Sequence, residues 1–214
     1  MQKYNLSPQW IVNGVDYPTY LSQMPEKINR AKNGEEIIQK IDHIKLNYQR
    51  SIRIQKSYRV NPDLLQVIRQ IDKSQQWIVL TEDWCGDSAQ NLPYIARMAG
   101  LNDKITLRIL RRDQNPDLME RYLTSGKRAI PKLIAFDENG VELFNWGPRP
   151  EPAIRLFEGL KDRGLEKKEI FTQLHQWYAR DGGKTLEREF YAILENLHRE
   201  RSKHKSAPQT LDVI

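Results

Sequence analysis

The stretch best equipped for chemistry is TEDWCGDS, residues 81–88, which holds the only cysteine of a 214-residue chain. A cysteine acts chemically as its thiolate, the form that attacks disulfides and binds metal ions. The apolar run at residues 77–80 predicts a strand that ends in this stretch, and a helix is expected to follow it. Cys85 would then lie at a helix start, where unpaired backbone N–H groups and the helix dipole favour the thiolate.

The neighbours of Cys85 act on its reactivity in opposite directions. Gly86 has no side chain, so a partner sulfur could approach, and Trp84 could form a flat wall over the site. Three acids lie within three residues of the sulfur: Glu82, Asp83 and Asp87. Their negative charge would oppose ionisation of the thiol. A turn with so many charges and a glycine also indicates an accessible sulfur, although free cysteines are often buried.

Ser88 stands where a second thiol would complete a dithiol site. Its hydroxyl cannot release a substrate from a mixed disulfide, because an alcohol is not a competent nucleophile toward sulfur. Two roles remain open for Ser88: a hydrogen bond to the Cys85 thiolate, or an ordinary bond to the backbone of the first helical turn. With one sulfur the site could capture a partner, and an external thiol would have to release it.

The elements around this turn predict an α/β protein. The helix after Cys85 would continue to Gly100 with a kink at Pro93, and Asn-Gly at 139–140 predicts a hairpin. Further strands are expected at residues 104–110, 132–136 and 141–146, a short helix at 117–126, and more helices from Glu151 onward. A parallel pair with a crossover helix, followed by a hairpin, gives a mixed sheet with helices on both faces.

Additions flank this core on both sides. Upstream, Ile37, Ile41, Ile44, Tyr48 and Ile52 have helical spacing and predict a helix from Gly34 to about Tyr58; a second helix is expected at 62–72, capped by Asn61. Downstream, two or three helices are expected, broken near Gly164 and at 181–183. We divide the chain into a helical extension (1–63), a core (64–163), a second helical extension (164–200) and a disordered tail (201–214).

The composition of the chain limits its possible partners and its location. The net charge of +6 is the difference between 34 basic and 28 acidic residues, so no nucleic-acid partner is expected; the densest basic segment, 40–59, is typical of a solvated helix face. The start of the chain does not resemble a signal peptide, and no apolar run could span a bilayer, which favours the cytoplasm. The four histidines, expected at the surface, form no metal-binding pattern: His43, His175, His198 and His204. We expect no cofactor.

Two separated motifs resemble the thioredoxin superfamily, and within it bacterial thioredoxin-like proteins of largely uncharacterised role. Trp-Cys-Gly-Asp-Ser lies at a strand-to-helix turn, and Ala129-Ile130-Pro131 precedes a strand and hairpin. The resemblance implies that Ile130-Pro131 is a cis-proline turn lying against the sulfur, with the Ile130 backbone free to pair with an extended substrate. Val79 departs from the family, because thioredoxins usually carry a buried carboxylate there; this agrees with the missing second thiol.

These observations leave three functions open. The first is a monothiol protein that forms a mixed disulfide with a protein or low-molecular-weight thiol, with Cys85 and Ser88 catalytic and substrate bound by Trp84, Gly86, Asp87, Ile130 and Pro131. The second is a non-catalytic binding or adaptor protein. The third is an iron–sulfur carrier similar to monothiol glutaredoxins, although Asp87 stands where those proteins have phenylalanine. Arg111 and Arg112 follow a strand near the cysteine turn and could bind an anionic partner. The oligomeric state stays open.

Overall fold

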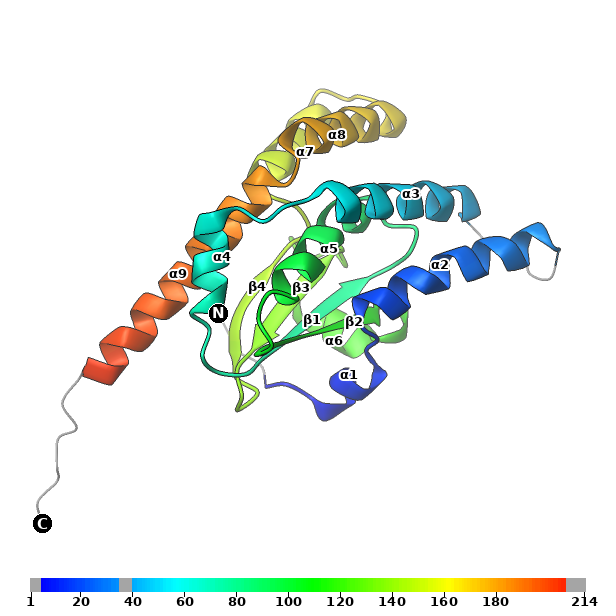
Figure 1. Ribbon diagram of the computed structural model, residues 1–214. Helices are drawn as coiled ribbons and strands as arrows, with labels where there is room; N and C mark the ends of the chain where they lie inside the picture. The colour runs from blue at the N-terminus through cyan, green and yellow to red at the C-terminus, as the bar shows by residue number, and fades with distance from the viewer. Residues whose placement is uncertain (1–4, 35–39, 207–214) are drawn as a thin grey trace, which may run out of the picture.

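The computed structural model, which describes residues 5–34 and 40–206, is built around one mixed sheet (Figure 1). Its strand order is β2-β1-β3-β4. The central strand β1 (Gln75–Thr81) pairs in parallel with β2 (Ile105–Arg111) and antiparallel with β3 (Lys132–Phe136), which forms a hairpin with β4 (Glu142–Trp146). The parallel pair, the hairpin and the mixed α/β sheet predicted from the sequence are confirmed.

The apolar residues of β1 pack on both faces of the sheet. Trp77 and Val79 point to one face, and Ile78 and Leu80 to the other; all four are completely buried. Because side chains alternate along a strand, a strand buried on both sides must be apolar throughout. The strand carrying the Cys85 turn is therefore fixed by packing on both faces.

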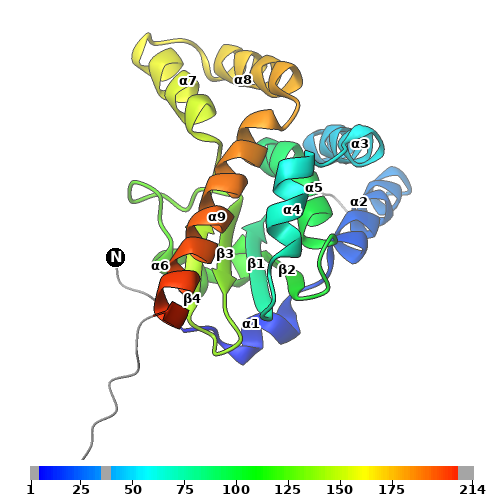
Figure 2. The same ribbon diagram turned by 60° about the vertical axis from the view of Figure 1, so that its left-hand side comes forward.

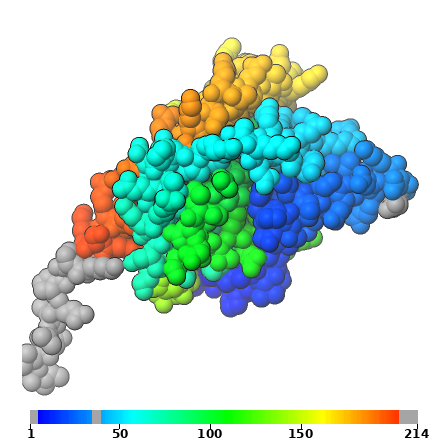
Figure 3. All heavy atoms as spheres, in the orientation of Figure 1, coloured from blue at the N-terminus to red at the C-terminus, as the bar shows by residue number. Residues whose placement is uncertain are grey.

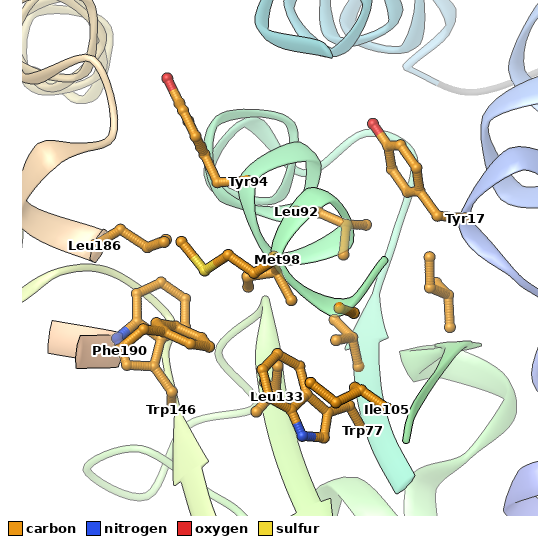
Figure 4. Packing of buried hydrophobic residues seen from close by; sticks show 14 of the residues in the cluster. Tyr17, Trp77, Leu92, Tyr94, Met98, Ile105, Leu133, Trp146, Leu186 and Phe190 are labelled. Carbon is orange, nitrogen blue, oxygen red and sulfur yellow. The ribbon is translucent and has the colours of Figure 1, made fainter. Parts of the chain in front are cut away.

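Five helices cover the first face of the sheet. They are α2 (Tyr17–Lys32), α3 (Ile41–Ser57), α4 (Pro62–Arg69), α5 (Gly86–Ala99) and α9 (Lys184–Ser206). Figure 4 shows side chains of α5 lying over the sheet, with Phe190 of α9 beside Trp146. Trp77 and Phe190 also pack ring against ring, with 5.8 Å between their centroids. One hydrophobic cluster thus joins the sheet to helices from both ends of the chain.

The second face carries less cover. Trp10 of α1 (Pro8–Asn13) and Leu118 and Met119 of α6 (Pro116–Arg121) pack there against Ile78 and Leu80. A 3-10 turn, η1 (Arg112–Gln114), links β2 to α6. Cys85 and Ile130 belong to this second cluster, which places the cysteine turn at the edge of the smaller core.

The helices α7 (Glu151–Asp162) and α8 (Lys167–Asp181) form a pair that stands off the sheet (Figure 2). Ala153, Leu174 and Tyr178 form their own small core. Gly182 in the left-handed conformation ends α8, and α9 then runs back along α4. No helix within residues 5–34 and 40–206 is both long and apolar enough to cross a membrane.

Several boundaries differ from those expected. The helix predicted from Gly34 begins at Ile41, after a left-handed Lys40, and Ile37 lies outside the described residues. Its buried stripe includes the polar residues Asn47 and Ser51. The short helix after Asn115 ends at residue 121 because a turn follows, and α9 continues to Ser206, six residues into the expected tail. The division at residues 64, 164 and 201 stays a prediction.

Candidate functional site

The fold brings the two sequence motifs into contact. Cys85 caps the N-terminus of α5 directly after β1, and its sulfur lies 3.3 Å from the carbonyl oxygen of Ile130, to which the thiol donates. The Ile130–Pro131 peptide bond is cis, as predicted, and Pro131 leads into β3. Because β1 and β3 are neighbours, residues 45 positions apart meet at one end of the sheet.

The sulfur of Cys85 is buried, so the expectation of an accessible sulfur is wrong. Cys85 is 8% exposed. Burial, followed by the negative charge of Asp87, raises the pKa of the Cys85 thiol to about 11, although hydrogen bonds from Ser88 and from the Asp87 backbone oppose the rise. Desolvation outweighs these bonds because a thiolate loses its hydration when water is excluded.

The acids around the sulfur are compensated by distant cations. Asp83 is 3% exposed and forms ion pairs with Lys27 of α2 and Arg111 of β2. The side-chain amide of Asn47 on α3 donates to the Asp83 carbonyl oxygen at 2.9 Å. Glu82 is half-buried and accepts a backbone hydrogen bond at 3.0 Å. The turn can therefore be both acidic and buried.

Asp87 is the centre of a second buried network. One of its carboxylate oxygens lies 2.6 Å from an Arg149 nitrogen, and the other accepts the Tyr178 hydroxyl at 2.9 Å. Asn91 donates to the Tyr178 oxygen and to the Asp87 carbonyl oxygen. This network ties the first turn of α5 to α8 and to the segment after β4.

Ser88 and Val79 agree with a site that lacks a resolving thiol. Ser88 is 1% exposed, and its oxygen accepts the Thr81 hydroxyl at 2.6 Å. The Ser88 side chain also acts to lower the pKa of Cys85, and the choice between the two roles left open for Ser88 stays a prediction. Val79 is fully buried among apolar residues, so no buried carboxylate stands at that position to accept a proton.

The space beside Gly86 is occupied by His175 of α8. A Cβ atom added at Gly86 would lie 3.0 Å from the His175 ring. The Nδ1 atom of that ring is 3.2 Å from the side-chain nitrogen of Gln90. Glycine at this position lets the His175 side chain of α8 pack closely over the turn, while Gly86 itself lines the cleft described below; the approach of a partner sulfur beside it stays a prediction.

Ile130 is less available than the sequence suggested. It is 6% exposed, and its carbonyl oxygen already accepts the Cys85 thiol. A peptide that pairs with a strand edge needs exposed backbone groups at regular intervals. The Ile130 carbonyl oxygen is therefore not free, because it accepts the Cys85 thiol; pairing of the rest of its backbone with a substrate stays a prediction.

A cleft of about 1350 Å³ opens above this turn. Its lining includes Trp84, Cys85, Asp87 and Ile130 together with residues of α3 and α8; in the space-filling view α8 is seen above α3 (Figure 3). Eight basic side chains line it: Lys40, Arg50, Arg53, Arg112, Arg128, Arg149, Lys167 and Lys168. Among the described residues of the lining, the acids are Asp87 and Glu166. The cleft is therefore strongly basic.

Cations also cover the Trp84 ring. The Lys40 ammonium lies 3.7 Å from the ring centroid and the Arg112 guanidinium 5.1 Å from it. The half-buried ring is thus a wall of the cleft, as expected, but its face is shared with positive charge. Arg111 lies inside the Asp83 network, so of the two arginines only Arg112 reaches the cleft lining.

The histidines are not all surface residues. His198 contacts the Val67 carbonyl oxygen at 3.1 Å, and His175 is partly buried at the cleft; only His43 is exposed, and the His204 side chain lies outside the described part. Because the histidines lie on separate helices, nothing in the sequence indicated that His175 lies at the site. The one available hint is that Phe171, His175 and Tyr178 share one stripe of α8. Within the described side chains no cluster of three metal-binding residues occurs.

Stability should fall in mild acid because of His175. Burial and the charges of Arg50 and Arg149 lower its pKa to about 4, against the opposing charge of Asp87. Between pH 4 and about 6.5 the unfolded chain binds more protons at this residue, so lowering the pH favours unfolding. After allowance for partial exposure, we expect a loss of about 1–2 kcal/mol.

Urea unfolding between pH 4 and pH 7 measures this effect for the wild type and for His175→Gln. The variant should show the flatter stability profile, and His43→Gln, at an exposed position on the cleft rim, should keep the wild-type profile. Equal slopes for His175→Gln and the wild type would contradict the assignment.

Comparisons with known proteins agree with this fold. The structure is similar to a protein of unknown function, PA1234 from Pseudomonas aeruginosa, with 18% identity, a TM-score of 0.59, and coverage of 92% of this chain and 99% of that one. It is also similar to an HIV epitope-scaffold, with 17% identity, a TM-score of 0.57, and coverage of 88% and 96%. None of the curated proteins compared with the chain matches it. The family model described as "Thioredoxin" matches residues 34–161, more than half of the sequence, so the chain belongs to this thioredoxin family.

Proposed function

We propose that the protein is a thioredoxin-fold binding protein, which holds a ligand in the cleft above Cys85 and keeps that cysteine as a neutral thiol. The observation that carries the proposal is the buried sulfur, which donates to the Ile130 carbonyl oxygen and has a pKa raised to about 11. At pH 7 such a group is ionised in about one molecule in ten thousand. The thiol form is not the nucleophile of disulfide exchange.

The packing around the turn supports the same proposal. His175 fills the space beside Gly86, and the Asp87 network holds α8 over the start of α5. These contacts hold α8 close to the turn that carries Cys85 and fix the side chains beside the cleft.

Monothiol exchange is the second candidate, and one observation favours it: Cys85 is among the residues that line the cleft, where a partner disulfide could reach it. The Cys85 thiolate would attack one sulfur of a protein or low-molecular-weight disulfide, whose other half would leave as a thiolate. Cys85 would remain in a mixed disulfide. A thiol from outside would then have to release it, because Ser88 cannot.

Alkylation of Cys85 by iodoacetamide across pH 6 to 11 tests the proposal. The chain has one cysteine, so each modified molecule reports this residue alone. We expect an apparent pKa above that of the denatured protein, whose cysteine should ionise at about 8.5. Reaction near neutral pH in the folded state, faster than in the denatured state, would overturn the proposal and establish the exchange candidate.

The variant Cys85→Ser separates the two candidates once a ligand is in hand. A binding protein should keep its affinity within about threefold, since serine preserves the polar contact to Ile130 at nearly the same size. An exchange protein would lose its mixed disulfide completely. Both measurements use the full chain.

A further inference from the structure

We propose that the ligand of the basic cleft is a small molecule carrying several oxyanion groups, phosphates or carboxylates. This inference rests on the proposed function, because it takes the cleft above Cys85 to be the binding site. It is carried by the charge, the placement and the chemistry of the residues that line the cleft.

The charge of the lining is strongly one-sided. Among the described residues of the lining, eight cations face two carboxylates. Three of the cations already have partners: Arg149 pairs with Asp87, Arg112 with Asp113 and Arg128 with Glu120. Within the described part of the chain, Arg53, Lys167 and Lys168 form no ion pair, and all three are exposed. Like charges held together without counter-charges repel each other, so the unliganded cleft favours any anion that enters it.

The positive charges of the cleft affect the pKa of His175, which lines it. Burial, followed by the charges of Arg50 of α3 and of Arg149, lowers the pKa of His175 to about 4 against the charge of Asp87, so the ring is neutral at pH 7. His175 thus adds no positive charge to the cleft, whose lysines and arginines stay charged at all physiological pH values.

The cations stand on different walls. Arg50 and Arg53 project from α3, Lys167 and Lys168 from the first turn of α8, and Arg128 lies just before Ile130. A single small anion such as one phosphate could not contact walls that different elements supply. The distribution therefore fits a ligand with two or more negative groups separated along its length.

The chemistry of the lining favours oxyanions. Five of its eight cations are arginines, whose planar guanidinium groups bind phosphate and carboxylate oxygens in pairs. The half-buried rings of Trp84 and Phe171 also line the cleft and can pack against an apolar part of the ligand. This combination of anchoring cations and aromatic faces is typical of small-molecule sites.

The fold also argues against an extended acidic peptide. The Ile130 carbonyl oxygen, which an extended peptide could have used, already accepts the Cys85 thiol, and Ile130 is buried. The volume of about 1350 Å³ is sufficient for a drug-sized or nucleotide-sized molecule. A small polyanion uses the walls without needing that carbonyl oxygen.

Isothermal titration calorimetry of the full chain tests the inference with tripolyphosphate and citrate as probes, at about 0.1 M salt. Tripolyphosphate represents ligands with several phosphates, and citrate represents tricarboxylates. We expect at least one probe to bind, and the tighter one identifies the oxyanion. The cleft variant Arg53→Gln/Lys167→Gln/Lys168→Gln should weaken that binding by about tenfold or more.

The control variant Lys161→Gln/Arg163→Gln/Arg180→Gln removes the same charge from exposed positions on and beside α7 and α8, outside the cleft lining. It should bind like the wild type, and both triple variants should unfold at the wild-type temperature. Equal loss in the two variants, or no binding of either probe, would overturn the inference.

A single-stranded oligonucleotide of about twelve residues is the competing ligand. Tighter binding of the oligonucleotide than of both probes, lost in the cleft variant, would replace a small ligand by nucleic acid. The inference and the proposed function can fail independently. Absence of anion binding would overturn the inference but would not change the alkylation result. An acidic, reactive Cys85 would refute the proposed function even if anions bind.

Discussion

Replacing Gly147 with alanine is expected to destabilise the fold by about 4 kcal/mol, the largest effect of any substitution considered for this protein. Gly147 follows β4 with φ +111°, a backbone conformation that side chains disfavour. A Cβ atom there would overlap the carbonyl oxygen of Pro131, and backbone atoms cannot move aside as a flexible side chain can. The Gly147 oxygen also accepts the Lys132 ammonium at 3.0 Å. Strain would therefore reach the turn that contacts Cys85.

Thermal unfolding measures this effect, with an expected fall in Tm of about 10 °C or more. Gly159→Ala is the matched control, because Gly159 lies exposed within α7 with nothing close to an added Cβ. It should be stabilised by up to about 1 kcal/mol, since alanine favours helices over glycine. Similar melting of Gly147→Ala and the wild type would show that the backbone contact with Pro131 is not tight.

Replacing Asp83 with asparagine is expected to cost about 3 kcal/mol. The change keeps the shape of the side chain but leaves Lys27 and the largely buried Arg111 without their counter-charge. Losing one member of a buried ion pair costs more than the pair contributes, because an uncompensated charge stays out of water. The effect should persist in high salt, which screens exposed charges far more than buried ones.

Urea unfolding at low and high salt measures the loss, and Asp42→Asn is its control. Asp42 pairs with Lys45 on the exposed face of α3 and is 88% exposed, so its substitution should change stability by no more than about 0.5 kcal/mol. If Asp83→Asn behaved like this control, the Asp83 network would contribute nothing to the packing of α2 on the sheet.

The sheet could be predicted from the sequence because its signals are local. The apolar run of β1 and the Asn139-Gly140 hairpin each specify a strand or turn within a few residues. In the structure the hairpin has Gly140 at φ +76°, and the Asp137 carboxylate accepts two backbone N–H groups. The same holds for α4, where the Asn61 side chain caps the helix as expected.

The long helix α2 could not be recognised because its signals conflict. Pro18 suits the first turn of a helix, but Pro25 lies inside it, where a proline removes a hydrogen bond. The helix forms nevertheless, because Asp16 caps it and its buried side chains, among them Tyr20 and Met24, pack onto the main core. Tertiary packing here outweighs local preference.

The burial of Cys85 could not be predicted because its causes are distant in sequence. The acids near Cys85 suggest an exposed turn. Their partners, however, are distant in sequence: Lys27 lies 56 positions from Asp83, and Arg149 lies 62 positions from Asp87. His175, which closes the space over Gly86, is farther still. No spacing rule connects such residues, so the electrostatics of the site emerged only from the fold.

The main hydrophobic cluster reaches from Tyr17 to Leu194, whereas the thioredoxin family model ends at residues 34 and 161. The part of the chain that matches the family is thus shorter than the part whose side chains form the main hydrophobic cluster. A chain cut to the family limits would keep α3, α4 and α5 on the first face of the sheet but would lose α2 and α9, leaving Trp77 without Phe190. It would also lose α8, whose residues line one side of the cleft over Cys85.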